Sequence, residues 1–166
     1  MYILADQLDE NALVAFKKYR KYLVSVSARF PPNAYELATS DWYFDFSDHK
    51  CPHDAWLNSV KIFEDASGDR EQERRVGIET VLLGAYHDFL LTFRYEGVVN
   101  YTLSGCDLDR SGGHYDWRYD EFRLSDRGLL IHEIEWASVV DQGRWLIECE
   151  DVMLSYQPYT RDWSDP

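Results

Sequence analysis

The chain has 166 residues, of which 45% are hydrophobic and 16% aromatic, and it carries a formal net charge of −13. This length predicts a single domain over residues 1–166, and so much apolar material excludes a disordered chain. The negative charge disfavours nucleic acids and anionic membranes as partners, because their phosphate groups would repel it.

An amphipathic helix is predicted over residues 9–30. Asp9 is a good N-cap, and the apolar side chains that follow at helical spacing form one stripe, at Leu13, Phe16, Leu23 and Val26. Pro31-Pro32 ends the helix, since proline lacks the amide and restricts the residue before it. A short helical turn is predicted over 33–39.

From 41 to 156 the pattern predicts an antiparallel sheet of about seven strands. The links at 125–128 and 137–143 are too short for a parallel crossover, residues 65–74 form a polar loop, and Glu96-Gly97 suits a tight hairpin. The fold class is therefore α+β: a β-meander, as a curled sheet or partly closed barrel, packed on one N-terminal helix. Residues 159–166 form a frayed tail. The strand patterns cover residues 42–46, 56–64, 76–86, 89–95, 98–104, 116–124, 129–136 and 144–156.

If the last two turns are centred in their loops, the last three strands align into rows on one face. Trp117 then faces Trp136, which faces Trp145, and Ile134 lies in the next row between Tyr119 and Ile147. Aromatic and aliphatic cross-strand rows stabilise a sheet. The three tryptophans could also line a ligand pocket.

The same register places carboxylates side by side on the opposite face. Like charges directly opposite each other destabilise a sheet by up to about 1 kcal/mol per pair. A divalent cation, a basic partner protein or simple solvation could offset this repulsion. The row comprises Asp120, Glu133 and Glu148, with Glu135 and Glu150 close by.

A third row on the tryptophan face brings together Glu121, His132 and Cys149. A carboxylate beside a histidine and a thiol outlines acid–base and nucleophilic chemistry. A buried His that is hydrogen-bonded to Glu is the simpler interpretation.

Metal and cofactor signals are few. His49, Cys51 and His53 lie within five positions and could bind zinc, but no second pair of ligands follows at a recognised spacing. The common nucleotide, hydrolase and zinc-protease motifs are absent, so no cofactor is predicted.

The compartment predicted is the cytoplasm. The sequence contains no run of about 18 apolar residues, and acids stand in residues 1–10, where a signal peptide needs a basic start. Three cysteines without a CxxC pair, Cys51, Cys106 and Cys149, indicate reduced thiols rather than a disulfide framework.

These observations favour a small acidic, non-catalytic binding protein that engages a basic protein, of an inhibitor or immunity-like type. A ligand-binding curled sheet or barrel is the first alternative, and a His/Glu/Cys or metal-dependent enzyme is the second. The sequence does not select an oligomeric state.

Overall fold

The computed structural model describes residues 5–104, 113–137 and 143–160, with side chains from residue 12 onward. Two helices come first: α1 spans Ala5–Val26, a 3-10 turn covers Ser27–Arg29, and α2 spans Pro32–Thr39. The long helix and the short helical turn predicted from the sequence are both present, with shifted bounds. Pro32 occupies the first position of α2, where a missing amide N–H costs little.

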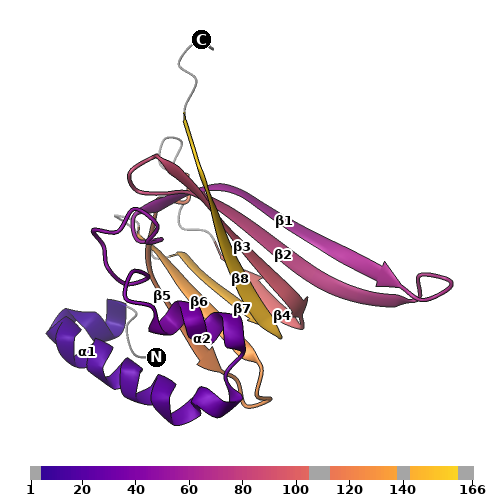
Figure 1. Ribbon diagram of the computed structural model, residues 1–166, viewed down its shortest axis with the longest axis horizontal. Helices are drawn as coiled ribbons and strands as arrows, with labels where there is room; N and C mark the ends of the chain where they lie inside the picture. The colour runs from indigo at the N-terminus through magenta and orange to yellow at the C-terminus, as the bar shows by residue number, and fades with distance from the viewer. Residues whose placement is uncertain (1–4, 105–112, 138–142, 161–166) are drawn as a thin grey trace.

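Eight antiparallel strands form one curled sheet, which does not close within the described residues (Figure 1). Their order across the sheet is β4-β7-β6-β5-β1-β2-β3-β8. The predicted α+β class, with an antiparallel curled sheet and an N-terminal helix, is confirmed. The predicted tail falls outside the described residues from 161 onward. The strands are β1 Ala55–Ser67, β2 Glu73–Leu83, β3 Phe89–Val98, β4 Asn100–Leu103, β5 Asp116–Leu124, β6 Leu130–Ala137, β7 Gly143–Cys149 and β8 Asp151–Pro158.

Two of these strands continue, after one interrupting residue, into the next. β4 follows β3 after Val99, and β8 follows β7 after Glu150; β3 pairs with β8, and β4 pairs with β7. The hairpin predicted at Glu96-Gly97 is therefore wrong. Gly97 has a φ of 59° beside a register shift in the β2–β3 ladder, which is the backbone conformation that a glycine supplies in a β-bulge.

β1 and β2 extend away from the rest of the sheet as a long hairpin, here called the hairpin arm (residues 59–76; Figure 1). β1 is bridged to β5 only at Ala55 and Trp56, whereas its bridges to β2 continue to Ser67. Both strands therefore reach into the segment predicted as a loop over 65–74. Only the tip of that segment is a turn.

Helix α1 covers the edge of β5 that β1 leaves free. The Tyr19 hydroxyl accepts a hydrogen bond from the Phe122 amide (2.9 Å) and donates one to the Phe122 carbonyl (3.0 Å). The Tyr22 hydroxyl accepts one from the Leu124 amide (2.7 Å). Buried backbone groups need partners, so two tyrosines of a helix take the place of a neighbouring strand.

The core lies between the helices and the inner face of the sheet. The predicted stripe of α1 is right at Leu23 and Val26, which are buried, and wrong at Leu13, which is 83% exposed. The strand predicted over 42–46 is also wrong, because this segment is a run of turns. Its Tyr43 side chain is nevertheless fully buried in the core.

Candidate functional site

A register shift in β5 decides which acidic side chains share a face. Trp117 lies opposite Trp136, as predicted, but the β5–β6 register moves by one residue directly after this pair. One extra residue in a strand turns the later side chains to the other face. Asp120 therefore lies on the core face and Glu121 on the opposite face, the reverse of the prediction.

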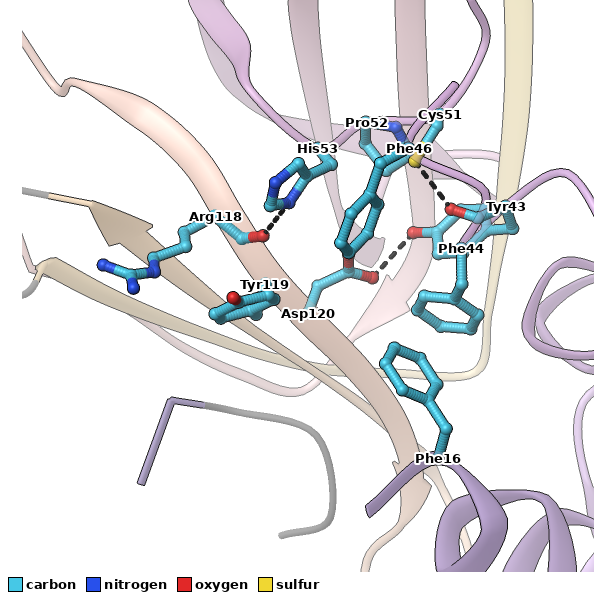
Figure 2. Close-up of a pocket in the computed structure, with 10 residues that line it drawn as sticks. All are labelled: Phe16, Tyr43, Phe44, Phe46, Cys51, Pro52, His53, Arg118, Tyr119 and Asp120. Carbon is cyan, nitrogen blue, oxygen red and sulfur yellow. Dashed lines mark hydrogen bonds between the residues drawn. The ribbon is translucent and has the colours of Figure 1, made fainter. Parts of the chain in front are cut away.

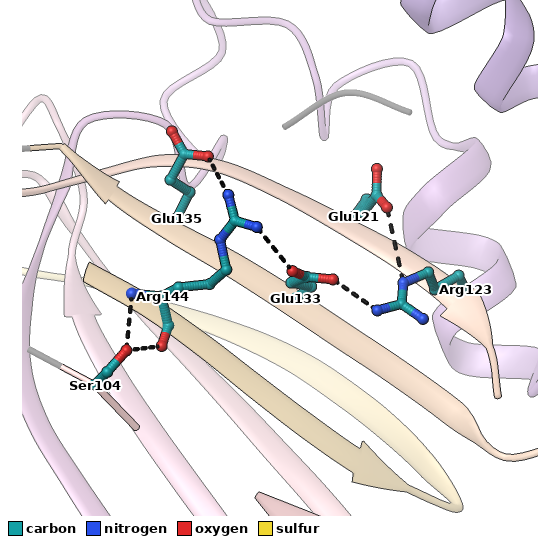
Figure 3. A network of polar contacts seen from close by, with 6 residues as sticks. All are labelled: Ser104, Glu121, Arg123, Glu133, Glu135 and Arg144. Atoms are coloured by element: carbon teal, nitrogen blue, oxygen red, sulfur yellow. Dashed lines mark hydrogen bonds and ion pairs between the residues drawn. The ribbon is translucent and has the colours of Figure 1, made fainter. Parts of the chain in front are cut away.

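Glu121 joins Glu133 and Glu135 in a carboxylate row on the face away from the tryptophans, and all three side chains are buried. Arg144 Nη1 lies 3.3 Å from Glu133 Oε1, and Arg144 Nη2 lies 3.4 Å from Glu135 Oε2. Arg123 Nη2 lies 2.7 Å from Glu133 Oε2 (Figure 3). Guanidinium groups of the same chain therefore offset the repulsion among these carboxylates.

The two remaining acids of the predicted set also have arginine partners. Arg127 Nε donates to Glu148 Oε1 at 3.1 Å, and the hydrogen bonds from Arg127 lower the pKa of Glu148. Arg75 Nη1 lies 3.2 Å from Glu150 Oε2. Glu148 is buried, so most of the row is both covered and already paired.

Asp120 sits at the centre of a buried polar network. Its Oδ2 accepts hydrogen bonds from the Tyr43 hydroxyl (2.7 Å) and from His132 Nε2 (2.9 Å), and its Oδ1 accepts one from Trp117 Nε1 (3.0 Å). The Tyr95 hydroxyl lies 2.8 Å from His132 Nδ1. Burial raises the pKa of Tyr43 and of Tyr95 well above the ordinary value, so both hydroxyls keep their protons. The tautomer with its proton on Nε2 donates to Asp120 and leaves Nδ1 to accept from the Tyr95 hydroxyl.

The row predicted from Glu121, His132 and Cys149 is not assembled. Glu121 is on the other face of the sheet, His132 is held by Asp120, and Cys149 lies opposite Leu130. Burial raises the pKa of Cys149 to about 12, which leaves little thiolate, the nucleophilic form, at neutral pH. His132 is therefore a core residue whose two ring nitrogens both have hydrogen-bond partners.

We expect Cys51 and Cys149 to resist thiol reagents in the folded protein. Both are buried, and burial raises the pKa of each to about 12. After brief exposure to a maleimide, mass-spectrometric peptide mapping should find neither residue labelled in native protein and both labelled in urea. The mapping separates them from Cys106, which lies outside the described residues. Rapid native labelling of Cys149 would contradict this expectation.

The predicted ligand-pocket residues Trp117, Trp136 and Trp145 are fully buried in the core. Their rings pack edge to face, with centroids 5.4 Å and 5.0 Å apart for the two successive pairs. Ile134, not Trp136, lies opposite Trp145. The register between β6 and β7 therefore differs by two residues from the predicted one. Because side chains alternate between the two faces of a sheet, a shift of two residues keeps the tryptophans and Ile134 on the predicted face, where aromatic packing stabilises the core.

The candidate zinc ligands do not converge. His49 Nδ1 lies 2.6 Å from Asp88 Oδ2, while Cys51 Sγ and His53 Nδ1 each contact a backbone carbonyl. Across the described ranges, no group of three His, Cys, Asp or Glu side chains is placed to hold a metal ion.

Instead, the structure gathers exposed aromatic rings and carboxylates around Trp56, a residue that the sequence did not single out. Trp56 is 49% exposed, its Nε1 donates to Asp116 Oδ1 at 2.8 Å, and its ring centroid lies 4.5 Å from that of His87. Exposed Trp and Tyr side chains are the usual anchors of protein interfaces.

Two stacked pairs each include a histidine that lies close to Trp56 along the chain. Phe46, 46% exposed, stacks on His53 with centroids 3.8 Å apart, and Tyr86, 48% exposed, stacks on His49 at 3.9 Å. The chain links these pairs to Trp56, because His53 is close to it in sequence and Tyr86 precedes its contact His87. We call this region the Trp56 surface, composed of Phe46, His49, His53, Asp54, Trp56, Tyr86, His87, Asp88 and Asp116.

The Trp56 surface is rich in acids. Asp54, Asp88 and Asp116 belong to it, and the loop that carries Phe46 adds Asp45 and Asp48. The carboxylate of Asp54 is largely exposed, and that of Asp88 is partly exposed. Exposed aromatic rings set among carboxylates suit a partner that offers cations and apolar contacts.

The backbone is strained on this surface and directly beside it. Asp54, His87 and Tyr115 have φ angles of 61°, 57° and 60°, in the left-handed region that residues other than glycine rarely adopt. All three flank Trp56: Asp54 is two positions away, His87 touches its ring, and Tyr115 precedes its partner Asp116. Such strain persists where the surrounding structure fixes it, and it clusters at functional sites.

A small pocket lies beside this surface, lined by aromatic side chains and by His53, Arg118 and Asp120 (Figure 2). Its cavity volume is about 10 Å³, close to the space that one water molecule needs. Ligand pockets are far larger, at roughly 300–1,000 Å³. The pocket therefore suits a bound water at the Asp120 network better than an organic ligand.

None of the helices in the described residues is long and apolar enough to cross a membrane. No protein-family model matches this chain, and no curated protein matches it.

Proposed function

We propose that this chain is a non-catalytic, cytoplasmic binding protein that engages a basic protein partner through the Trp56 surface. The observation that carries the proposal is the set of three aromatic rings, each nearly half exposed, set among aspartates. The net charge of −13 would speed encounter with a cationic surface, and the aromatic rings would supply contact area.

The buried groups support the same choice of function. The histidine–aspartate network is closed off in the core, the thiol pKa values are raised, and the pocket described above has room for only about one water molecule. The proposed contact is the Trp56 surface rather than Asp120, Glu133 and Glu148, because these three acids are buried and already paired. In type, the protein would resemble an inhibitor or immunity-like protein that neutralises a cationic target.

We expect a basic protein to be retained from host lysate by the immobilised chain at low salt and released at high salt. Trp56→Ala, and separately Asp54→Asn with Asp88→Asn, should weaken retention by about tenfold, because each removes part of the contact. The measurement is quantitative affinity capture, followed by titration of the captured protein.

Matched controls change similar groups elsewhere. Tyr101→Ala removes an exposed aromatic ring of β4, and Glu36→Gln with Asp69→Asn removes two exposed charges. These controls should bind as the wild type does. Equal retention by all variants, or no salt-sensitive basic protein at all, would count against the proposed surface.

A further inference from the structure

The edge of β1 in the hairpin arm has unused hydrogen-bonding capacity. From Ser59 to Ser67, β1 is bridged to β2 on one side, and among the residues described no strand lies on the other side. The free N–H and C=O groups of such an edge can pair with a further strand. Val60 and Ile62, next to this edge, are 39% and 45% exposed.

The charges along this edge have a symmetric arrangement. Lys61, Phe63 and Asp65 alternate along β1 and so share one face. Phe63 lies over Gly77 of β2, where an added Cβ would come within 2.5 Å of the ring, and Lys61 Nζ lies 5.5 Å from the centre of the Phe63 ring. A cation and an anion thus flank Phe63 at equal distances along the strand.

We propose that two copies of this chain associate by antiparallel pairing of their β1 edges about a two-fold axis at Phe63. The four strands β2, β1, β1 and β2 would then form one continuous sheet. The axis places Phe63 opposite Phe63, and Lys61 of each copy opposite Asp65 of the other. Two opposite-charge cross-strand pairs result, and such pairs stabilise an antiparallel sheet.

Other registers of the same pairing are disfavoured by charge. An axis at Lys61 sets two lysines opposite each other, and an axis at Glu64 or Asp65 sets two carboxylates opposite each other. Like charges directly opposite each other destabilise the pair. An axis at Ile62 sets Lys61 opposite Phe63 and Val60 opposite Glu64, and so forms no charge pair of either kind. The charges of the edge therefore favour a second copy in the register centred on Phe63.

The test is sedimentation equilibrium of the full chain over a wide range of concentrations. Wild type should change from one chain of 19.6 kDa to twice that mass as its concentration rises. Lys61→Glu and Asp65→Lys should each raise the dissociation constant about tenfold, because each converts two attractive pairs into two repulsive ones. Lys18→Glu and Glu36→Lys, on the exposed faces of α1 and α2, make the same charge changes away from the edge and should have no effect.

Mixing the two variants separates charge complementarity from misfolding. In a mixed dimer of one Lys61→Glu chain and one Asp65→Lys chain, position 61 of each chain would again face an opposite charge at position 65 of the other. An equimolar mixture of the two variants should therefore recover wild-type association, although each variant alone associates about tenfold more weakly. Wild type that remains monomeric, a dimer that is insensitive to both single changes, or a mixture without recovery would each overturn the proposal.

Discussion

Replacement of Asp120 by alanine is expected to lower the free energy of unfolding by about 3 kcal/mol or more. The change would leave three buried donors, on Tyr43, Trp117 and His132, without their common acceptor. Unsatisfied buried polar groups lose hydration without gaining a partner, which is the origin of the large effect. Urea denaturation followed by tryptophan fluorescence measures it.

Asp116→Ala is the matched control, because Asp116 also accepts a hydrogen bond from a tryptophan, Trp56, but on the surface. Water can replace that bond, so the expected loss is below about 1 kcal/mol. Asp120→Asn fills the same space but should still be strongly destabilising. The N–H groups of the asparagine amide would face the hydrogen-bond donors that the Asp120 carboxylate accepts from. If Asp120→Ala costs no more than Asp116→Ala, the network does not stabilise the fold.

The role of Asp120 shows where the sequence pattern stops being informative. The alternation in β5 and β6 correctly places Trp117 and Trp136 opposite each other on the core face. The shift after this pair comes from a single extra residue, and no glycine or proline marks it in the sequence. Side-chain period alone therefore assigned Asp120 and Glu121 to the wrong faces.

The hairpin arm illustrates a second limit of prediction from the sequence pattern. Residues 56–64 have the composition of a strand and form one, but whether a strand is covered depends on what lies beside it. β1 leaves β5 after Trp56, so side chains that would be buried in a wider sheet are exposed. The Trp56 surface was missed for the same reason: exposure of an aromatic residue is a tertiary property.

Gly97 illustrates a third limit of prediction from the sequence, because the same local sequence is compatible with two backbone structures. Glycine after a short polar step favours both a tight turn and a bulge, since each requires a positive φ. Here β3 continues through Gly97 and Val98, and β4 then pairs with β7. Only the long-range partner strand distinguishes the two outcomes.

The open edge of β5 leads to the second large prediction, that Tyr19→Phe destabilises the fold by about 2 kcal/mol. The hydroxyl both accepts from the Phe122 amide and donates to the Phe122 carbonyl, and burial raises the pKa of Tyr19 well above its ordinary value, so it stays protonated. The substitution removes one oxygen atom, and with it the partner of two buried backbone groups on an edge that β1 does not cover. Chemical denaturation measures the loss, and Tyr101→Phe on exposed β4 is the control.

Hydrogen exchange locates the effect within the sheet. The Phe122 amide should exchange much faster in Tyr19→Phe than in the wild type, because its acceptor is gone. The exchange rates of β6 amides that pair within the sheet, such as the amide of Ile134, should rise only as far as the loss in global stability requires. Tyr22→Phe, which removes one partly buried bond to Leu124, should have a smaller effect. A Phe122 amide that stays as protected as its β6 neighbours in Tyr19→Phe would mean that α1 does not stand in for a strand at this edge.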